Sequence, residues 1–324
     1  MIDSINFIIR NIKNIDLKHL NNLKIRCYPL ESGIGYHFIY KTVQFQYYKV
    51  SNVLFIKTNT HYILNKKHIL LSDKEIYKEK INKILVEIIG DSSLQLELNR
   101  IDFYVDIYVG NLVKIYIDLL KKHKDSYKYM KRKKIYKTSS YIKTKVGQTK
   151  MNMYDKYTCV QDKLIKQAIK PKIDSKEYLG TIRLEIQNTK EKIKNLYVKD
   201  GVEKILDNYW NKDMMNLLFF DFLEGYLYHG DYYKLKEAKK IIKSSDYSQN
   251  WKIKLSDFLF KISIYGINEI FERKIYCEDT IKSYIDKLNI LKINPITIDK
   301  ELPYNKLENI LTLARATAEK EYFK

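Results

Sequence analysis

Residues 100–107 alternate strictly between polar and apolar side chains, and no other feature constrains the fold of this chain as much. Successive side chains on a β-strand point to opposite sides, so a period of two residues predicts a strand. One face of this strand carries Arg100, Asp102, Tyr104 and Asp106. The other face carries Ile101, Phe103, Val105 and Ile107. The strand therefore belongs in a sheet that packs a core on one side and holds charged groups on the other.

Two later strands, at residues 152–156 and 182–187, repeat this arrangement on a smaller scale. Their alternate polar side chains are Asn152, Tyr154 and Lys156 in the first and Arg183, Glu185 and Gln187 in the second. A single polar face is usually just the solvent side of a sheet. The three together are more specific, because arginine is scarce in this chain and two arginines stand in Arg-x-Asp and Arg-x-Glu. If the strands are neighbours, carboxylates, arginines, a lysine and a tyrosine converge on one face.

The rest of the first 200 residues also predicts strands mixed with helices. Residues 1–12 read as a strand, and β-rich stretches between residues 36 and 64 read as a hairpin or meander. A capping pattern at Ser72 predicts the start of a helix, and Gly90 predicts its end. The apolar stripe of this helix starts at Ile76. Further elements are expected as a helix at 112–120, a hairpin at 139–157 and a helix at 158–169.

From about residue 202 the alternation stops and helical spacing takes over. We therefore expect an α+β domain at residues 1–200, with an antiparallel-rich sheet and crossover helices, and a mostly helical domain at 201–324. Its helices are expected at 251–264, 267–273 and 278–291. The last of these is similar to the recognition helix of a helix-turn-helix, with Lys282 and Lys287 facing outward as DNA contacts. An ordinary helical packing domain is the alternative.

The charge of the chain favours a polyanionic partner. Its 59 Lys and Arg against 39 Asp and Glu give a net charge of +20, which attracts and captures nucleic acid. Residues 121–150 hold twelve of the cations and one acid. We expect this run to contact phosphates, with a solvated basic loop as the alternative. The densest part of the run is Lys131, Arg132, Lys133 and Lys134.

Composition also excludes several classes of protein. The 29 Tyr and 12 Phe argue against intrinsic disorder, and three widely spaced cysteines do not make a disulfide scaffold. No apolar run reaches the roughly 18 residues needed to cross a bilayer, and the N-terminal segment does not read as a signal peptide. We expect a cytosolic protein with no membrane partner.

The converging side chains suit chemistry at a phosphodiester. Two carboxylates can hold a divalent cation, which polarises the phosphate. Lysine and arginine stabilise the charge that develops in the transition state. An activated tyrosine hydroxyl can attack phosphorus and form a tyrosyl-phosphate bond, which keeps the energy needed to rejoin the strand. The sequence has no His-hydrophobic-His pair, no zinc pattern and no phosphate-binding glycine loop, so any metal would be bound by carboxylates.

In these residues the sequence resembles the gene II replication initiator family of filamentous phages and its plasmid relatives. The resemblance rests on Met1-Ile2-Asp3 at the start, on Arg100-Ile101-Asp102, on Tyr154-Asp155-Lys156 and on Arg183-Leu184-Glu185, in that order and at similar spacing. It covers roughly residues 1–200 and is weaker beyond them.

The resemblance implies an endonuclease that starts rolling-circle replication. Such an enzyme uses Mg²⁺ or Mn²⁺ to nick one strand of a double-stranded origin and becomes linked to the 5′ phosphate through tyrosine. It later cuts and rejoins the displaced single strand. DNA is therefore the expected partner, in the cytoplasm of a bacterial host. A host helicase is a further candidate partner.

The resemblance also implies roles for individual residues. Tyr154 takes the place of the nucleophile, Asp102 and Glu185 are candidate metal ligands, and Lys156 would neutralise the scissile phosphate. Arg100 and Arg183 would position phosphate or lock the carboxylates, and a purely structural salt bridge is an equal alternative. Asp106 is expected to hold other site residues in place without contacting the substrate. Tyr157 is a rival nucleophile, but it lies three residues after Tyr154, and on a strand an odd spacing puts it on the opposite face.

Two other functions stay open at this point. One is a conjugative or mobilisation relaxase with the same chemistry, which nothing in the sequence separates from an initiator. The other is a non-catalytic basic DNA-binding protein that uses its sheet and helical domain for repression or packaging.

Overall fold

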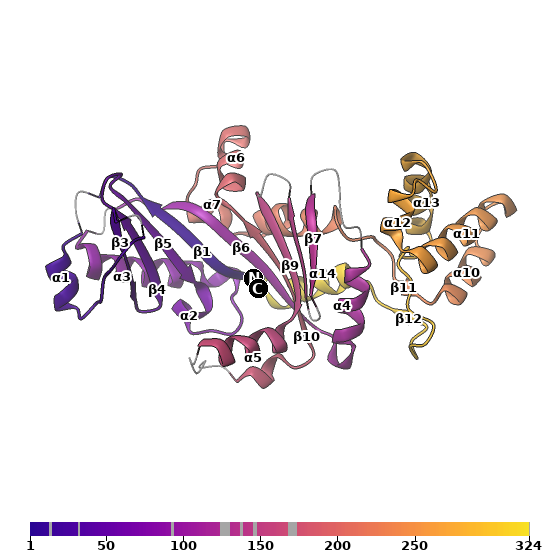
Figure 1. Ribbon diagram of the computed structural model, residues 1–324, viewed down its shortest axis with the longest axis horizontal. Helices are drawn as coiled ribbons and strands as arrows, with labels where there is room; N and C mark the ends of the chain where they lie inside the picture. The colour runs from indigo at the N-terminus through magenta and orange to yellow at the C-terminus, as the bar shows by residue number, and fades with distance from the viewer. Residues whose placement is uncertain are drawn as a thin grey trace.

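The protein is built around one large antiparallel sheet, as the alternating segments predict. The computed structural model describes residues 1–12, 15–31, 33–91, 94–123, 130–136, 139–144, 148–167 and 174–323, without the side chains of 130–136, 140–144 and 163–167. Within these residues, ten strands pair in the order β2-β3-β4-β5-β1-β6-β10-β9-β8-β7. Helices flank the sheet, and a mostly helical C-terminal part lies at one end of the molecule (Figure 1). The expected α+β class is confirmed.

The strands of the sheet follow the sequence pattern closely. They are β1 (Ile2–Ile9), β2 (Tyr28–Pro29), β3 (Gly35–Tyr40), β4 (Val43–Tyr48), β5 (Val53–Asn59), β6 (Glu97–Tyr108), β7 (Met130–Tyr136), β8 (Ser139–Thr144), β9 (Thr149–Asp155) and β10 (Thr181–Asn188). The predicted meander is β3-β4-β5, and the predicted hairpin is β8-β9. Part of the basic run forms β7, which pairs with β8. Long β6 lies between β1 and β10 near the middle of the sheet.

The helices in the first 200 residues are α1 (Leu17–Asn22), α2 (Thr60–Leu64), α3 (Lys74–Ile89), α4 (Val113–Lys121), α5 (Lys156–Gln167) and α6 (Lys190–Asp200). Helix α3 ends at Gly90, whose φ of 76° is the left-handed conformation that glycine adopts freely. Its start differs from the expectation, because Ser72 lies in a short 3₁₀ turn and the Asp73 carboxylate accepts from the Leu70 amide instead. Ile76 is exposed and Tyr77 is buried in its place, packed against Trp210.

The C-terminal part consists of α7 (Leu206–Tyr209), α8 (Lys212–Met215), a π-helical turn (Asn216–Phe220), α9 (Asp221–Glu224), α10 (Leu235–Ser244), α11 (Gln249–Tyr265), α12 (Ile267–Glu272), α13 (Glu278–Ile290) and α14 (Ile310–Glu321), with a small sheet of β11 (Tyr232–Tyr233) and β12 (Lys306–Leu307). The three predicted helices are therefore present as α11, α12 and α13. Helix α14 returns to the large sheet and packs against β6 (Figure 1). The domain boundary near residue 200 stays a prediction. Across the described ranges, no helix combines the length and apolarity that crossing a bilayer requires.

Strand β1 is shorter than β6, so in the described structure the end of β6 beyond Phe103 has no strand paired to it on that side. The Tyr104 amide donates to the Met1 carbonyl at 2.7 Å. Farther along, the Asp106 amide donates to the Tyr322 hydroxyl at 3.4 Å. Met1 and the end of α14 thus cover the part of the β6 edge that β1 leaves unpaired, close to the polar side chains described below (Figure 1).

The register of the outer meander can be tested with two neighbouring residues of β3. Phe38 is 2% exposed and stacks on Phe45, whereas Ile39 is 62% exposed on the opposite face. We predict that Phe38→Ala lowers the free energy of unfolding by about 3–5 kcal/mol, because it leaves a cavity in the core. Ile39→Ala serves as the control and is expected to change it by less than about 0.5 kcal/mol. Urea unfolding measures both, and equal losses would contradict the register.

Candidate functional site

Three strands of the sheet bring the predicted polar side chains together. In β10, Arg183 lies opposite Asp106 of β6 on one side and opposite Tyr154 of β9 on the other. Glu185 lies between Tyr104 and Asn152 in the same way. The predicted neighbourhood of these strands is therefore confirmed. We call this surface the polar face, and its members are Arg100, Asp102, Tyr104, Asp106, Asn152, Tyr154, Arg183, Glu185 and Gln187.

The centre of the polar face is buried, whereas Arg100, Asn152, Tyr154 and Gln187 are partly exposed. Arg183 and Asp102 are each 1% exposed, and Asp106 and Glu185 are each 7% exposed. Burying a charge costs several kcal/mol unless a partner of opposite charge or several hydrogen bonds compensate it. An ordinary solvated sheet face does not incur this cost, so the buried charges of the polar face need the partners described below.

Arg183 is the charged centre of the polar face. Its Nε and Nη2 each donate to Asp106 at 2.6 Å, and its Nη1 donates to Asp3 at 2.7 Å. Its Cζ lies 3.8 Å from the centre of the Tyr104 ring, a cation–π contact. Burial alone would raise the pKa of Asp106, but the Arg183 charge and its two hydrogen bonds outweigh burial and hold that pKa below its usual value. These contacts are compatible both with the locking of carboxylates and with the structural salt bridge that was the alternative, so the role of Arg183 stays a prediction.

Asp3 and His61 join the polar face although the alternation did not assign them to it. Between Ile2 and Ser4 the β1–β6 register shifts, so Asp3 is the extra residue of a β-bulge beside Asp102. His61, in α2, places Nε2 3.5 Å from the Asp3 carboxylate. Burial opposes ionisation of Asp3, but the adjacent His61 ring and the charge of Arg183 keep the pKa of Asp3 well below its usual range. The break in alternation at Ile2-Asp3-Ser4-Ile5 was the available sequence signal.

Tyr154 and Glu185 form a direct hydrogen bond on the polar face. The Tyr154 hydroxyl donates to Glu185 Oε2 at 2.9 Å. The other oxygen, Oε1, accepts from the Gln187 amide at 2.6 Å and from the Asn152 amide at 3.3 Å. Burial, reinforced by the Glu185 charge, raises the pKa of the Tyr154 hydroxyl well above its usual value. The pair therefore has the geometry of a nucleophile with an oriented base.

Lys156 lies beside this pair but not on the strand where we expected it. Strand β9 ends at Asp155, whose carboxylate accepts from the Thr158 amide and hydroxyl and so starts α5 at Lys156. The expected helix at 158–169 thus begins two residues early. The buried Lys156 ammonium still lies 6.0 Å from the ring centre of Tyr154 and 5.3 Å from that of Tyr178. Its charge therefore remains next to the candidate nucleophile.

Arg100 and Asp102 form a second ion pair on the polar face. Arg100 Nε and Nη2 donate to the two oxygens of Asp102 at 2.8 and 2.6 Å. Burial raises the pKa of Asp102 to about 7, although the Arg100 hydrogen bonds and charge act in the opposite direction. Asp102 lies opposite Gln187, two residues along β10 from Glu185. In the part of the chain that the structure describes, no three His, Cys, Asp or Glu side chains are grouped to hold a metal ion.

The remaining predicted residues lie apart from the polar face. The side chains of Lys131, Arg132, Lys133 and Lys134 fall outside the described part of the structure. Lys282 is exposed on α13. Lys287, on the same helix, is instead stacked on Trp251, 4.3 Å from the ring centre, and on Tyr247, at 5.2 Å. Tyr157 lies in the first turn of α5.

Comparisons with known proteins add little to what the site shows about function. No protein-family model matches the chain, and no curated protein matches it. Among solved structures, it is similar to a rolling circle replication initiator protein from Geobacillus stearothermophilus, with 11% sequence identity and a TM-score of 0.33 over 62% of this chain and 79% of that one. A similarity this distant carries no argument, so the resemblance to the phage family stays a prediction and the function must be argued from the site.

The buried ion pair can be tested against an exposed one. We predict that Asp106→Asn lowers the free energy of unfolding by about 3–5 kcal/mol, because it leaves the Arg183 charge under-compensated in the core. The control is Glu79→Gln, which removes an exposed pair with Lys83 and is expected to cost about 0.3–0.5 kcal/mol. Urea unfolding at neutral pH compares them, and a loss for Asp106→Asn as small as the control would contradict the role of Arg183.

The same pair predicts the pH dependence of stability. The pKa of Asp106 is lower in the folded protein than its unfolded value of about 3.9. Its stabilising contribution is therefore complete above that value and is lost as the pH falls through the folded pKa. We expect the stability gap between the wild type and Asp106→Asn to be constant at pH 5–7 and to narrow below about pH 4. Urea midpoints measured from pH 2.5 to 7 would show it, and a gap that stays constant at low pH would be inconsistent with this pairing.

Proposed function

We propose that this protein nicks and rejoins DNA at a specific site and so starts rolling-circle replication of a phage or plasmid in the cytoplasm of a bacterial host. One observation carries the proposal: the Tyr154 hydroxyl donates to the oriented Glu185 carboxylate beside the buried Lys156 ammonium. Their combination matches what tyrosine attack on a phosphodiester requires.

The proposed reaction starts with the transfer of a proton from Tyr154 to Glu185. As the proton moves, the tyrosyl oxygen forms a bond to phosphorus, and the bond from phosphorus to the 3′ oxygen breaks. The electron pair of that bond leaves with the 3′ oxygen, which takes a proton from water and becomes a free hydroxyl, while the proton on Glu185 is released to the solvent. The product is a 5′-phosphotyrosyl link. Rejoining is the reverse reaction, in which a 3′ hydroxyl attacks phosphorus and Tyr154 regains its proton.

The neighbouring residues support this step in different ways. Because the pKa of Tyr154 is raised, the hydroxyl stays protonated at rest, and the base must act at the moment of attack. Gln187 and Asn152 orient Glu185 by donating to its other oxygen. Lys156 supplies positive charge where the phosphate must approach Tyr154. Arg183 is a positioning residue, since its donors hold Asp106 and Asp3.

We propose a divalent ion, Mg²⁺ or Mn²⁺, as the cofactor of this reaction. Mg²⁺ commonly binds to proteins through only one or two carboxylates, with water and substrate phosphate completing its shell. Asp102 and Glu185, on neighbouring strands of the polar face, would hold it in exchange for the hydrogen bonds that they now accept from Arg100 and from Tyr154, Gln187 and Asn152. The ion would polarise the phosphate and neutralise the charge that develops on it.

The partners follow from charge and chemistry. A net charge of +20 supports binding of both the double-stranded origin and the displaced single strand. The basic residues of β7 and the exposed Lys282 of α13 are proposed phosphate contacts. A host helicase is a further proposed partner that would open the duplex ahead of the nick.

The nucleophile is tested by removing one oxygen atom. We predict that Tyr154→Phe abolishes nicking of supercoiled DNA that carries the cognate origin, and abolishes the covalent protein–DNA product, while DNA binding is retained. Tyr157→Phe is the matched control, because Tyr157 is nearby in sequence but begins α5, and it should nick normally. Gel separation of nicked circles and of protein-linked DNA measures both. Nicking by Tyr154→Phe would show that Tyr154 is not the nucleophile. If neither the wild type nor a variant nicks, the result would favour a non-catalytic DNA-binding protein.

The base and the metal are tested by the two carboxylates. We predict that Glu185→Gln slows nicking by about 10²–10⁴-fold, because it removes the proton acceptor. Asp102→Asn should abolish the stimulation by Mg²⁺ that EDTA removes in the wild type. Salt-sensitive DNA binding should persist in both variants, since neither residue carries positive charge. Mg²⁺-dependent nicking at the wild-type rate in both variants would exclude these assignments.

A further inference from the structure

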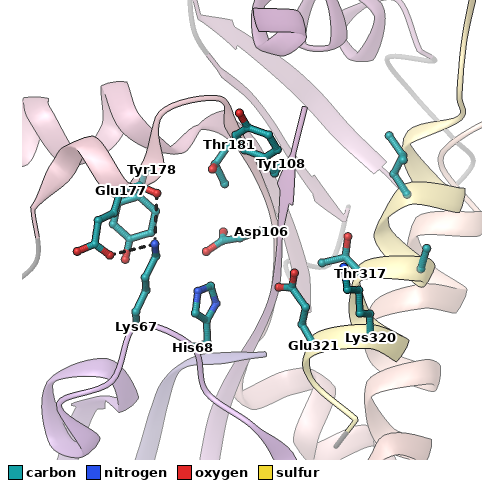
Figure 2. Close-up of a pocket in the computed structure, with 12 residues that line it drawn as sticks. Lys67, His68, Asp106, Tyr108, Glu177, Tyr178, Thr181, Thr317, Lys320 and Glu321 are labelled. Carbon is teal, nitrogen blue, oxygen red and sulfur yellow. Dashed lines mark hydrogen bonds and ion pairs between the residues drawn. The ribbon is translucent and has the colours of Figure 1, made fainter. Parts of the chain in front are cut away.

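A cavity of about 400 Å³ opens beside one end of the polar face. Its walls come from four parts of the chain: the loop before α3, the end of β6, the residues around the 3₁₀ turn Ser175–Tyr178, and α14. Figure 2 shows Thr317, Lys320 and Glu321 of α14 facing Lys67, Glu177 and Tyr178 across the space, with His68 and Asp106 between them. The proposed reaction uses no group from the opening of this cavity.

The cavity is connected to the proposed nucleophile through two contacts. The Lys156 ammonium lies against the rings of both Tyr154 and Tyr178, and Tyr178 lines the cavity. Asp106, which also lines it, is held by Arg183, the residue opposite Tyr154 in the sheet. A group bound in the cavity would therefore lie close to a phosphate placed at Tyr154.

The charges in the cavity argue against a phosphate as its occupant. Three carboxylates line it, those of Asp106, Glu177 and Glu321, against the ammonium groups of Lys67 and Lys320. Lys67 is already paired with Glu177 at 3.0 Å. Asp106 is neutralised by Arg183, and Lys320 balances Glu321, so the lining has no surplus of positive charge to hold a phosphate. An uncharged group with both donors and acceptors would find partners there. The edge of a nucleobase is such a group, and carboxylates accept hydrogen bonds from its exocyclic amino groups.

An exposed aromatic ring stands at the mouth of the cavity. Tyr108, the last residue of β6, is 76% exposed. Gly180 allows its ring to lie there: its φ is +73°, and a Cβ atom at Gly180 would come within 2.9 Å of the Tyr108 ring. Every base has a flat face that stacks on such a ring, and this stacking is a common means of holding single-stranded nucleic acid.

We propose that this cavity holds one unstacked nucleobase of the single strand, next to the phosphate that is cut, and that it favours bases with an exocyclic amino group over thymine. The base stacks on Tyr108 and directs its amino group toward the carboxylates. This proposal rests on the proposed function, because it assumes that the substrate strand passes over Tyr154. It gives the catalytic part of the chain a role in base selection that the polar face alone does not provide.

The experiment measures binding without cleavage, so that it does not depend on nicking. Single-stranded oligo(dC), oligo(dA) and oligo(dT) of about ten nucleotides, within the range of site sizes known for such proteins, are titrated with protein in EDTA and followed by fluorescence anisotropy. Thr317→Trp fills the cavity from α14. Thr312→Trp places the same ring on an exposed part of that helix outside the cavity and is the control. Ala316→Trp, at an exposed position that lines the cavity, is a second filling variant if Thr317→Trp unfolds.

We expect the wild type and Thr312→Trp to bind oligo(dC) or oligo(dA) about 5- to 150-fold more tightly than oligo(dT). The cavity-filling variants should bind all three with equal affinity, close to that for oligo(dT). Equal preference in wild type and filled variants would overturn the proposal. So would binding of free dCMP with the affinity of the oligonucleotide, because the cavity would then serve a free nucleotide. A preference that the filled variants lose, in a protein that never nicks, would leave the base site standing and reject the proposed function.

Discussion

The buried ion pairs of Arg183 are the interaction on which the site depends. One guanidinium binds the carboxylates of Asp106 and Asp3 and so joins strands β10, β6 and β1 across the centre of the sheet. A slip of one residue in the pairing of β10 would turn Arg183 toward the apolar core and leave both carboxylates without their partner. The cluster therefore makes the incorrect register costly, and the correct register is the one that places Glu185 against Tyr154.

The two arginine–carboxylate pairs of the polar face differ in their electrostatic balance. Asp106 receives two hydrogen bonds from a fully buried arginine and keeps a low pKa. Asp102 also receives two, from a more exposed arginine, and burial dominates, so its pKa rises to about 7. The first carboxylate is therefore fixed as a structural charge. The Asp102 carboxylate is held less firmly in its ionised form. This suits its proposed role, which is to bind a divalent ion that arrives with the substrate.

The sequence was sufficient to predict the strands and the polar face of each, because both follow from a local period of two residues. That the three faces adjoin rested on their order and on the resemblance, and the pairing of β10 with β6 and β9 supplies it. It also predicted that Tyr154 and Glu185 lie on one surface. Asp3 was missed because a β-bulge changes the side to which a side chain points, and only the pairing with β6 reveals the bulge. His61 and Tyr178 reach the site from a helix and a short turn whose positions are set by tertiary packing. Lys156 was placed on the wrong element because the cap formed by Asp155 ends the strand one residue earlier.

The contacts that complete the site join distant parts of the chain. Asp3 and Arg183 are 180 residues apart, and Asp106 and Tyr322 are 216 apart. Closing loops of this length carries a large entropic cost before any contact is gained. The meander of β3, β4 and β5 is local and can form early, whereas the polar face and the wall made by α14 require the chain to have collapsed around them. We therefore expect the site to be among the last regions to acquire native order, so that a partly folded chain holds its outer meander before it holds its reactive groups.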